Sequence, residues 1–230
     1  NKLATLARFR HALAEWQQHA QKRTLAFCAS LRHAEFMASQ FVKAGIPSAA
    51  VYAGSPLSRA EALTQLRGRQ LAVLFSVDLF NEGVDLPEID TVMMLRPTES
   101  KILFLQQLGR GLRKSEGKNR LVVLDFVANH QGFLHKPQAL FGIKANFREL
   151  ARFARDIERR QFVLPKGCYV NYDLRLLDFL KSLDGAGAAK DYEALKQTLC
   201  RRPTLTEFHR AGASVTAMRR QFGGWYGLLK

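Results

Sequence analysis

Five short apolar segments, separated by polar or helical stretches, constrain the fold of this chain more than any other feature. The apolar segments cover residues 25–29, 49–52, 71–75, 91–95 and 121–126. Helical patterns cover residues 34–43, 58–67 and 102–110. Short apolar strands that alternate with helices form a mainly parallel sheet with helices on both faces, so the sequence predicts an α/β fold. Ligands of such a sheet bind beyond the carboxyl ends of its strands.

The strand pattern stops near His130, and helical patterns follow it. Further helices are predicted over residues 147–160, 174–183 and 192–199, and a compact helical unit over residues 203–230. Apolar residues recur at spacings of three or four in residues 1–20 and predict an amphipathic helix there. We therefore predict a helical connector over residues 1–21, an α/β domain over 22–130 and a basic all-α domain over 131–230.

The positive charge of the chain favours a polyanionic partner. Its net charge is +15 and its sequence pI is about 10.2. The part up to His130 has 17 basic and 11 acidic residues, net +6, and the remainder has 18 and 9, net +9. Clustered Lys and Arg bind nucleic acid by releasing condensed counterions. The alternative is a basic protein whose charge serves only solubility.

The three cysteines predict neither a disulfide framework nor a metal site. Cys28, Cys168 and Cys200 are odd in number and far apart, and no Cys/His ligand spacing occurs. This cysteine usage fits a reducing, cytoplasmic location. No apolar run is long enough to cross a bilayer, so we expect no membrane partner. The chain starts at Asn1 without an initiator methionine or signal-peptide pattern, so we expect a fragment of a longer protein.

The segment from Gln106 to Arg113 predicts a phosphate-binding helix face. Positions 106, 109, 110 and 113 share one face of a helix, so Gln106, Arg110 and Arg113 can converge on one target. Gly109 permits a close backbone approach. Two guanidiniums aimed at one place require an anion with several acceptors, and phosphate has that geometry. The alternative is a solvated basic helix face.

A second segment, residues 76–87, places several polar residues after the third predicted strand. Such a loop at a strand's carboxyl end can offer backbone N–H groups to phosphate and carboxylates to a ribose hydroxyl. Taken alone, the segment also fits an ordinary turn rich in Asp and Asn.

Together, these two motifs on this α/β pattern resemble the C-terminal motor (RecA-like) domain of superfamily 2 DEAD/DEAH-type bacterial helicases. The resemblance covers about residues 22–130. Residues 24–33 are similar to the family's motif IV, residues 53–55 to a turn that touches the nucleic-acid backbone, residues 76–85 to motif V and residues 106–113 to motif VI.

The resemblance implies a role for each matching residue. Arg110 and Arg113 would be arginine fingers, and Gln106 would orient the γ-phosphate region. The residues implied near the nucleotide are Gly83, Asp85 and Gly109, with Asp85 toward the ribose. The residues implied on the nucleic-acid side are Gly54, Ser55, Ser76 and Asp78. Motif VI begins Gln-Gln here, whereas RNA helicases of the DEAD-box group commonly have His-Arg, and this departure favours DNA over RNA.

The chain has no complete phosphate-binding loop. Residues 116–119 read Glu-Gly-Lys-Asn and lack both the first glycine and the hydroxyl of that motif. We therefore expect ATP with Mg²⁺ to be bound mainly by an N-terminal RecA-like lobe of the same polypeptide. This chain alone is expected to be inactive as an ATPase.

The C-terminal part carries a resemblance of its own. Residues 131–230 are similar to the helical extension of helicases that can carry a phospholipase-D-like nuclease domain. Residues 203–225 resemble a short helix-turn-helix unit, in which Thr216, Arg219 and Arg220 would meet DNA. The alternative is a structural three-helix cap with a solvated basic face.

The sequence thus predicts the second motor lobe of an ATP-dependent DNA helicase or translocase, which supplies arginine fingers and part of the nucleic-acid track. The competing hypothesis is a non-catalytic DNA-binding or scaffold fragment whose motor lobe is inert.

Overall fold

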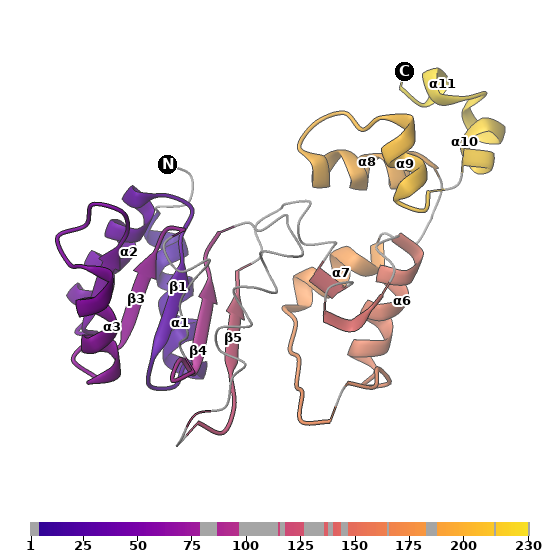
Figure 1. Cartoon of the computed structure of the whole chain (residues 1–230). Coiled ribbons are helices and arrows are strands. Elements are labelled where there is room, and N and C mark those ends of the chain that lie inside the picture. The colour runs from indigo at the N-terminus through magenta and orange to yellow at the C-terminus, as the bar shows by residue number, and fades with distance from the viewer. Residues whose placement is uncertain are drawn as a thin grey trace. The chain divides into compact units, whose positions relative to one another are not determined.

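The chain divides into two compact units, Asn1–Ala128 and Asn129–Lys230, which are described separately (Figure 1). The computed structural model describes residues 5–78, 87–96, 115, 118–126, 136–137, 140–143, 147–164, 166–182, 188–213 and 215–229.

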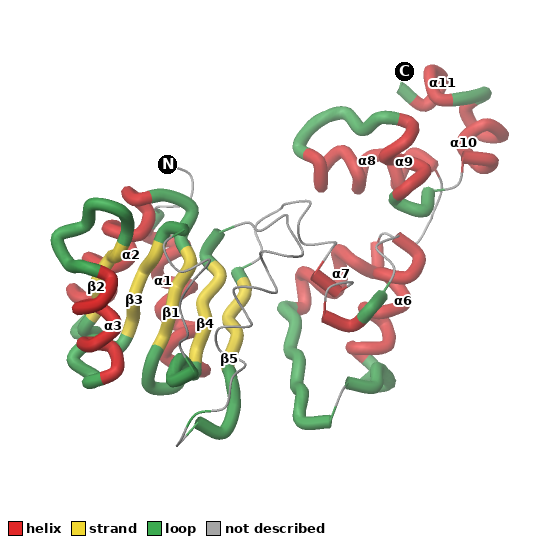
Figure 2. The backbone as a smooth tube through the Cα atoms, in the orientation of Figure 1, coloured by secondary structure: helices red, strands yellow, loops and turns green. Residues whose placement is uncertain are grey.

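The first unit contains a five-stranded sheet (Figure 2). Its strands are β1 (Thr24–Phe27), β2 (Ser48–Val51), β3 (Val73–Ser76), β4 (Thr91–Met94) and β5 (Val122–Asp125). Their order across the sheet is β2-β3-β1-β4-β5, and each neighbouring pair is parallel. The predicted parallel α/β fold is therefore confirmed.

Three described helices pack on this sheet: α1 (Leu6–His19), α2 (Leu31–Lys43) and α3 (Arg59–Arg67). Helix α2 starts at Leu31, three residues before the predicted start, because the Ser30 side chain caps it by accepting the His33 N–H. Helix α3 has a full capping box, in which Ser58 and Glu61 each accept the other's backbone N–H.

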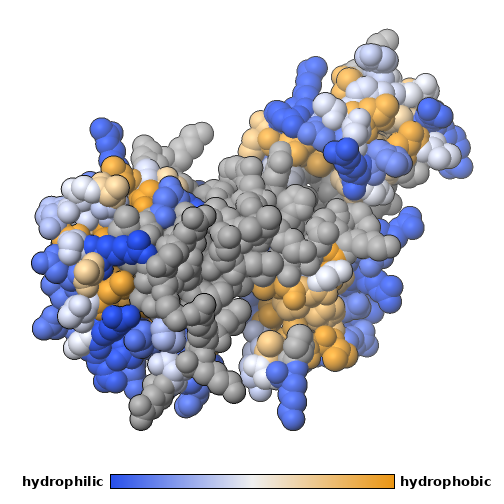
Figure 3. All heavy atoms as spheres, in the orientation of Figure 1, coloured by the Kyte–Doolittle hydropathy of each residue, from blue (hydrophilic) through white to orange (hydrophobic). Residues whose placement is uncertain are grey.

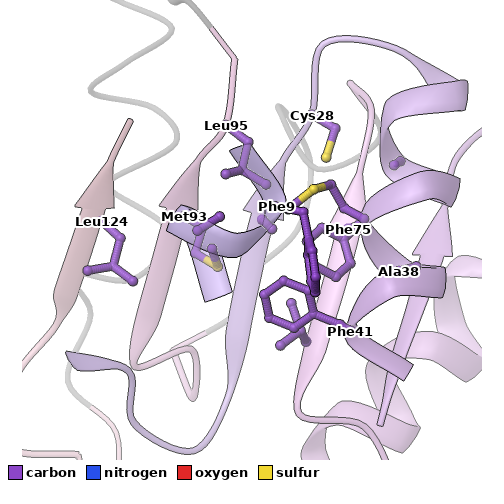
Figure 4. Packing of buried hydrophobic residues seen from close by; sticks show 13 residues of the cluster. Phe9, Cys28, Ala38, Phe41, Phe75, Met93, Leu95 and Leu124 are labelled. Carbon is purple, nitrogen blue, oxygen red and sulfur yellow. The ribbon is translucent and has the colours of Figure 1, made fainter. Parts of the chain in front are cut away.

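Helices α1 and α2 cover one face of the sheet and enclose its main core (Figure 4). Phe41 of α2 is completely buried and contacts three aromatic rings edge-on, those of Phe9, Trp16 and Phe75. The predicted N-terminal helix therefore packs on the sheet as part of the first unit. Helix α3 contacts β2 and β3, and its Ala62, Leu63 and Leu66 are buried.

Asp90 fixes the start of β1 at the amino edge of the sheet. One carboxylate oxygen accepts the Lys22 and Arg23 backbone N–H groups at 3.0 and 2.9 Å. The Gln21 side-chain amide donates to the Asp90 carbonyl at 2.7 Å. Asp90 is 6% exposed, so these bonds satisfy donors that water would otherwise have to reach.

The second unit is helical in all its described elements of regular structure. These are α6 (Phe147–Glu158), α7 (Leu174–Ser182), α8 (Ala188–Leu199), α9 (Leu205–Arg210), α10 (Val215–Phe222) and α11 (Trp225–Leu228). Their core includes Leu150, Leu180, Phe208 and Met218. Helix α8 starts four residues before its predicted start. Among the described residues, no helix is long and apolar enough to cross a membrane.

Candidate nucleic-acid interface

The parallel register brings the carboxyl ends of the five strands into one row. Ser76 of β3 pairs with Val51 on one side and with Phe27 on the other, and Met94 continues the row to Asp125. The residues that follow each strand therefore line a single edge. Two of the predicted nucleic-acid segments, residues 53–55 and 76–78, lie at this edge.

The turn after β2 is closed by its own hydrogen bonds. The Ser55 N–H donates to the Tyr52 carbonyl at 3.0 Å, and the Tyr52 N–H donates to Ser55 Oγ at 3.3 Å. The Ser55 hydroxyl also donates to the Leu57 carbonyl at 2.7 Å. Gly54 has φ +86, and no heavy atom lies within 4 Å of the position a Cβ would take. The turn is thus ordered by internal bonds and leaves an open approach to the Gly54 backbone.

The end of β3 presents Ser76 and Asp78 differently. Ser76 is completely buried, and its hydroxyl has no hydrogen-bond partner among the described residues. Asp78 is exposed, has φ 55 and forms an ion pair with Arg96, which follows β4. Because β1 lies between β3 and β4, this pair spans the end of the central strand. The Asp78 carboxylate is therefore paired with a guanidinium at this edge.

The junction of β1 and α2 contains a buried histidine beneath the same edge. His33 is 3% exposed, and its Nδ1 accepts the Ala29 N–H at 3.4 Å. Burial, and then the Arg8 guanidinium, lower the pKa of His33, so the ring stays neutral. Cys28 is completely buried, and burial raises the pKa of its thiol. At neutral pH Cys28 therefore offers no thiolate and His33 no cation, and both side chains are buried from ligands.

The predicted nucleotide contacts lie outside the described residues. They are Gln106, Gly109, Arg110, Arg113, Gly83 and Asp85. Their predicted roles stay predictions. Within the described part of the chain, no cluster of three or more His, Cys, Asp or Glu residues is suited to a metal ion.

In the second unit, α10 presents a polar face. Thr216, Arg219 and Arg220 are exposed, whereas Met218 on the same helix is 1% exposed and joins the core. Figure 3 shows hydrophilic and hydrophobic residues intermixed over the C-terminal helices. The predicted DNA-contacting residues therefore share the solvent side of one helix.

Helix α9 begins at a charged cap. Thr204 accepts the Glu207 N–H and Glu207 accepts the Thr204 N–H, while Arg201 forms an ion pair with the Glu207 carboxylate. Gly212, with φ +81, lies in the turn between the helices. Phe208 and Met218 pack in the core beneath them. The cap therefore fixes the start of α9, and the shared core holds both helices.

Acid should weaken the α9 cap. The hydrogen bond from Arg201, followed by the Thr204 N–H, lowers the pKa of Glu207 from 4.5 to about 2. A lowered folded-state pKa stabilises the fold fully above about pH 4.5, and that contribution is lost as pH falls toward 2. We expect Glu207→Gln to reduce hydrogen-exchange protection of α9 at pH 6 and to flatten its dependence on pH below 4.5.

The partner variant Arg201→Ala should act in the same direction, because it removes the largest cause of the shift. One result would contradict this account: hydrogen-exchange protection of α9 in the Glu207→Gln variant that still falls by the wild-type amount between pH 4.5 and 2.

The sequence alone does not mark three residues that form side-chain pairs near this edge: Arg96, Tyr52 and Glu35 of α2. Arg96 holds Asp78, and the Tyr52 hydroxyl donates to the Glu35 carboxylate. Each pair joins residues 17 or 18 positions apart. No local pattern marks them, because Asp78 and Arg96 meet through the strand order of the sheet and Tyr52 and Glu35 through the packing of α2 beside β2.

Comparison with known proteins gives a family match within the first unit. Residues 2–115 match the family described as the helicase conserved C-terminal domain. The Schizosaccharomyces pombe protein named "Putative mitochondrial ATP-dependent helicase irc3" is 40% identical over 114 residues, which are 48% of this chain and 19% of that protein. The Saccharomyces cerevisiae "Putative ATP-dependent helicase IRC3" is 30% identical over 132 residues, 56% of this chain and 19% of that protein.

This chain thus spans about a fifth of the length of these two relatives. Among solved structures, the E. coli DEAD-box protein SrmB bound to regulator of ribonuclease activity A has 19% sequence identity to this chain. Its TM-score is 0.46, with 57% of this chain and 74% of that chain covered.

Proposed function

We propose that this chain is the second motor lobe of an ATP-dependent DNA helicase or translocase. The proposal starts from the match of residues 2–115 to the conserved C-terminal domain of helicases. The observation that carries the proposal is the convergence of the 53–55 turn and the end of β3 at one sheet edge. Both segments match helicase motifs, and the resemblance implies that residues at these motif positions contact nucleic acid.

In this proposal, ATP with Mg²⁺ is held mainly by an N-terminal RecA-like lobe of the same polypeptide and supplies the free energy for movement. Arg110 and Arg113 neutralise charge that develops on the transferred phosphoryl group, and Gln106 orients that region. Gly83, Gly109 and Asp85 lie near the nucleotide, with Asp85 toward the ribose. These roles rest on the resemblance of the motifs.

On the nucleic-acid side, Gly54 and Ser55 contact the backbone of the tracked strand. The Ser76 side chain is buried, so Ser76 supports this edge from below and does not contact the strand with its hydroxyl. Asp78 positions Arg96 through their ion pair. DNA is favoured over RNA by the Gln-Gln start of motif VI. The exposed basic face of α10 also supports DNA, since it suits a helix-turn-helix unit over residues 203–230.

The intact polypeptide containing this chain provides the test. Its ATP hydrolysis should rise on addition of single-stranded or duplex DNA and respond much less to RNA of the same length. Equal stimulation by RNA would overturn the choice of DNA. A polypeptide that binds DNA without any stimulated hydrolysis would instead support a scaffold with an inert motor lobe.

Binding of duplex DNA by this chain should depend on α10. Replacing both Arg219 and Arg220 by Ala removes two cations, so the slope of log K against log salt should become shallower by about 1.8. Fluorescence anisotropy of a labelled duplex between about 50 and 200 mM salt measures this slope.

Lys43→Ala is the matched control, because Lys43 is an exposed cation at the end of α2 in the first unit. It should leave the slope unchanged. If the Arg219/Arg220 double variant keeps the wild-type slope as well, the basic face of α10 is only solvated.

A further inference from the structure

Tyr52 links the turn at residues 53–55 to helix α2. It follows β2 directly, and its hydroxyl donates a hydrogen bond to Oε1 of Glu35. This bond is the largest cause that raises the pKa of Tyr52, so the phenol retains its proton at neutral pH and above. Glu35 belongs to α2, whose buried side chains are part of the main core. This Tyr52–Glu35 hydrogen bond, called the tie below, therefore connects a surface turn to a helix that is packed into the core.

Tyr52 also takes part in closing the turn itself. Its N–H and carbonyl are bonded to the hydroxyl and the N–H of Ser55, respectively. The backbone of Tyr52 thus fixes the geometry of the turn, while its side chain fixes the turn to α2. Movement of one requires movement of the other.

The turn is open at Gly54. At Gly54 nothing lies within 4 Å of the position a Cβ would occupy, so a ligand backbone can approach there. The Glu35 carboxylate has the same sign of charge as a phosphodiester and so cannot itself attract one. Its bond to Tyr52 gives that carboxylate a structural role.

We propose that Tyr52 and Glu35 are positioning residues that hold the 53–55 turn in the conformation that binds a nucleic-acid backbone. This proposal rests on the proposed function. Without the tie, the turn adopts its binding conformation for only part of the time, and apparent affinity falls in proportion to that fraction. Chemistry at the nucleotide is unaffected once nucleic acid is bound.

The test uses the intact helicase and titrates its ATP hydrolysis with single-stranded DNA. Tyr52→Phe removes only the hydroxyl and should raise the half-stimulating DNA concentration about threefold to tenfold, with turnover at saturating DNA unchanged. Tyr169→Phe is the matched control, because Tyr169 is 94% exposed in the second unit. It should leave both quantities unchanged.

Variants at Glu35 separate positioning from general stability. Glu35→Ala should reproduce the effect of Tyr52→Phe, and the two changes together should add nothing further. Glu35→Gln keeps an acceptor oxygen for the phenol and should restore most of the wild-type response.

Two results would overturn the positioning role. One is a Tyr52→Phe variant with the wild-type half-stimulating concentration, and the other is a loss confined to turnover at saturating DNA. Absence of DNA stimulation in the wild-type enzyme would count against the proposed helicase function itself, so the two failures are distinguishable.

Discussion

Arg113→Ala should lower nucleic-acid-stimulated ATP hydrolysis of the intact polypeptide by about 10³- to 10⁵-fold, the range known for loss of an arginine finger. The guanidinium offers a planar fork of donors to phosphate oxygens, and alanine offers none. Since this role is confined to the reacting nucleotide, DNA binding should change little. Single-turnover hydrolysis and DNA anisotropy, measured on the same preparation, separate the two effects.

Arg120→Ala is the matched control for this experiment. Arg120 is another arginine of the first unit; it is exposed and lies before β5, outside the helicase motifs. Its replacement should leave hydrolysis within about twofold of wild type, as expected for a surface position away from the site. Unchanged turnover in Arg113→Ala would refute the assignment of a motor lobe.

Phe41→Ala should destabilise the first unit by about 3–5 kcal/mol, the usual cost of removing a large aromatic from a core. Phe41 is fully buried, with ring centroids 5.0 Å from Phe75, 5.7 Å from Trp16 and 5.9 Å from Phe9. Its loss leaves a cavity between α1, α2 and the sheet and breaks all three edge-to-face contacts. This is a large fraction of the stability of an ordinary domain.

Urea unfolding followed by hydrogen exchange in peptides that cover β1 and β3 reports on this unit alone. Val42→Ala is the control, since Val42 is the next residue of α2 and is 54% exposed. It should shift the midpoint only slightly. Similar losses for the two variants would mean that Phe41 is not the centre of the core.

The fold was largely predictable because its signals are local. Each strand is short and apolar, and the described strands of β1, β3 and β4 are buried throughout. The main errors were at helix ends. Helix α2 begins earlier than its apolar pattern because Ser30 caps it, and α8 begins earlier, at Ala188, a residue that is buried in the core.

The candidate site was predictable only in part. The turn at Gly54 and the exposed face of α10 followed from motif resemblance and helical spacing. The buried state of Ser76 did not, since a serine at a strand end is ordinarily exposed. It is buried because the strand row places it between Val51 and Phe27.

By itself, the sequence determined the alternation of strands and helices, the basic charge and the motifs that point to a helicase lobe. These features depend on residue type and on spacing along the chain. Only the tertiary structure decided which distant side chains meet: Asp78 with Arg96, Tyr52 with Glu35, and Asp90 with the start of β1. The physical reason is that these contacts depend on the strand order β2-β3-β1-β4-β5 and on the packing of α2 beside β2, and local periodicity places no constraint on which elements become neighbours.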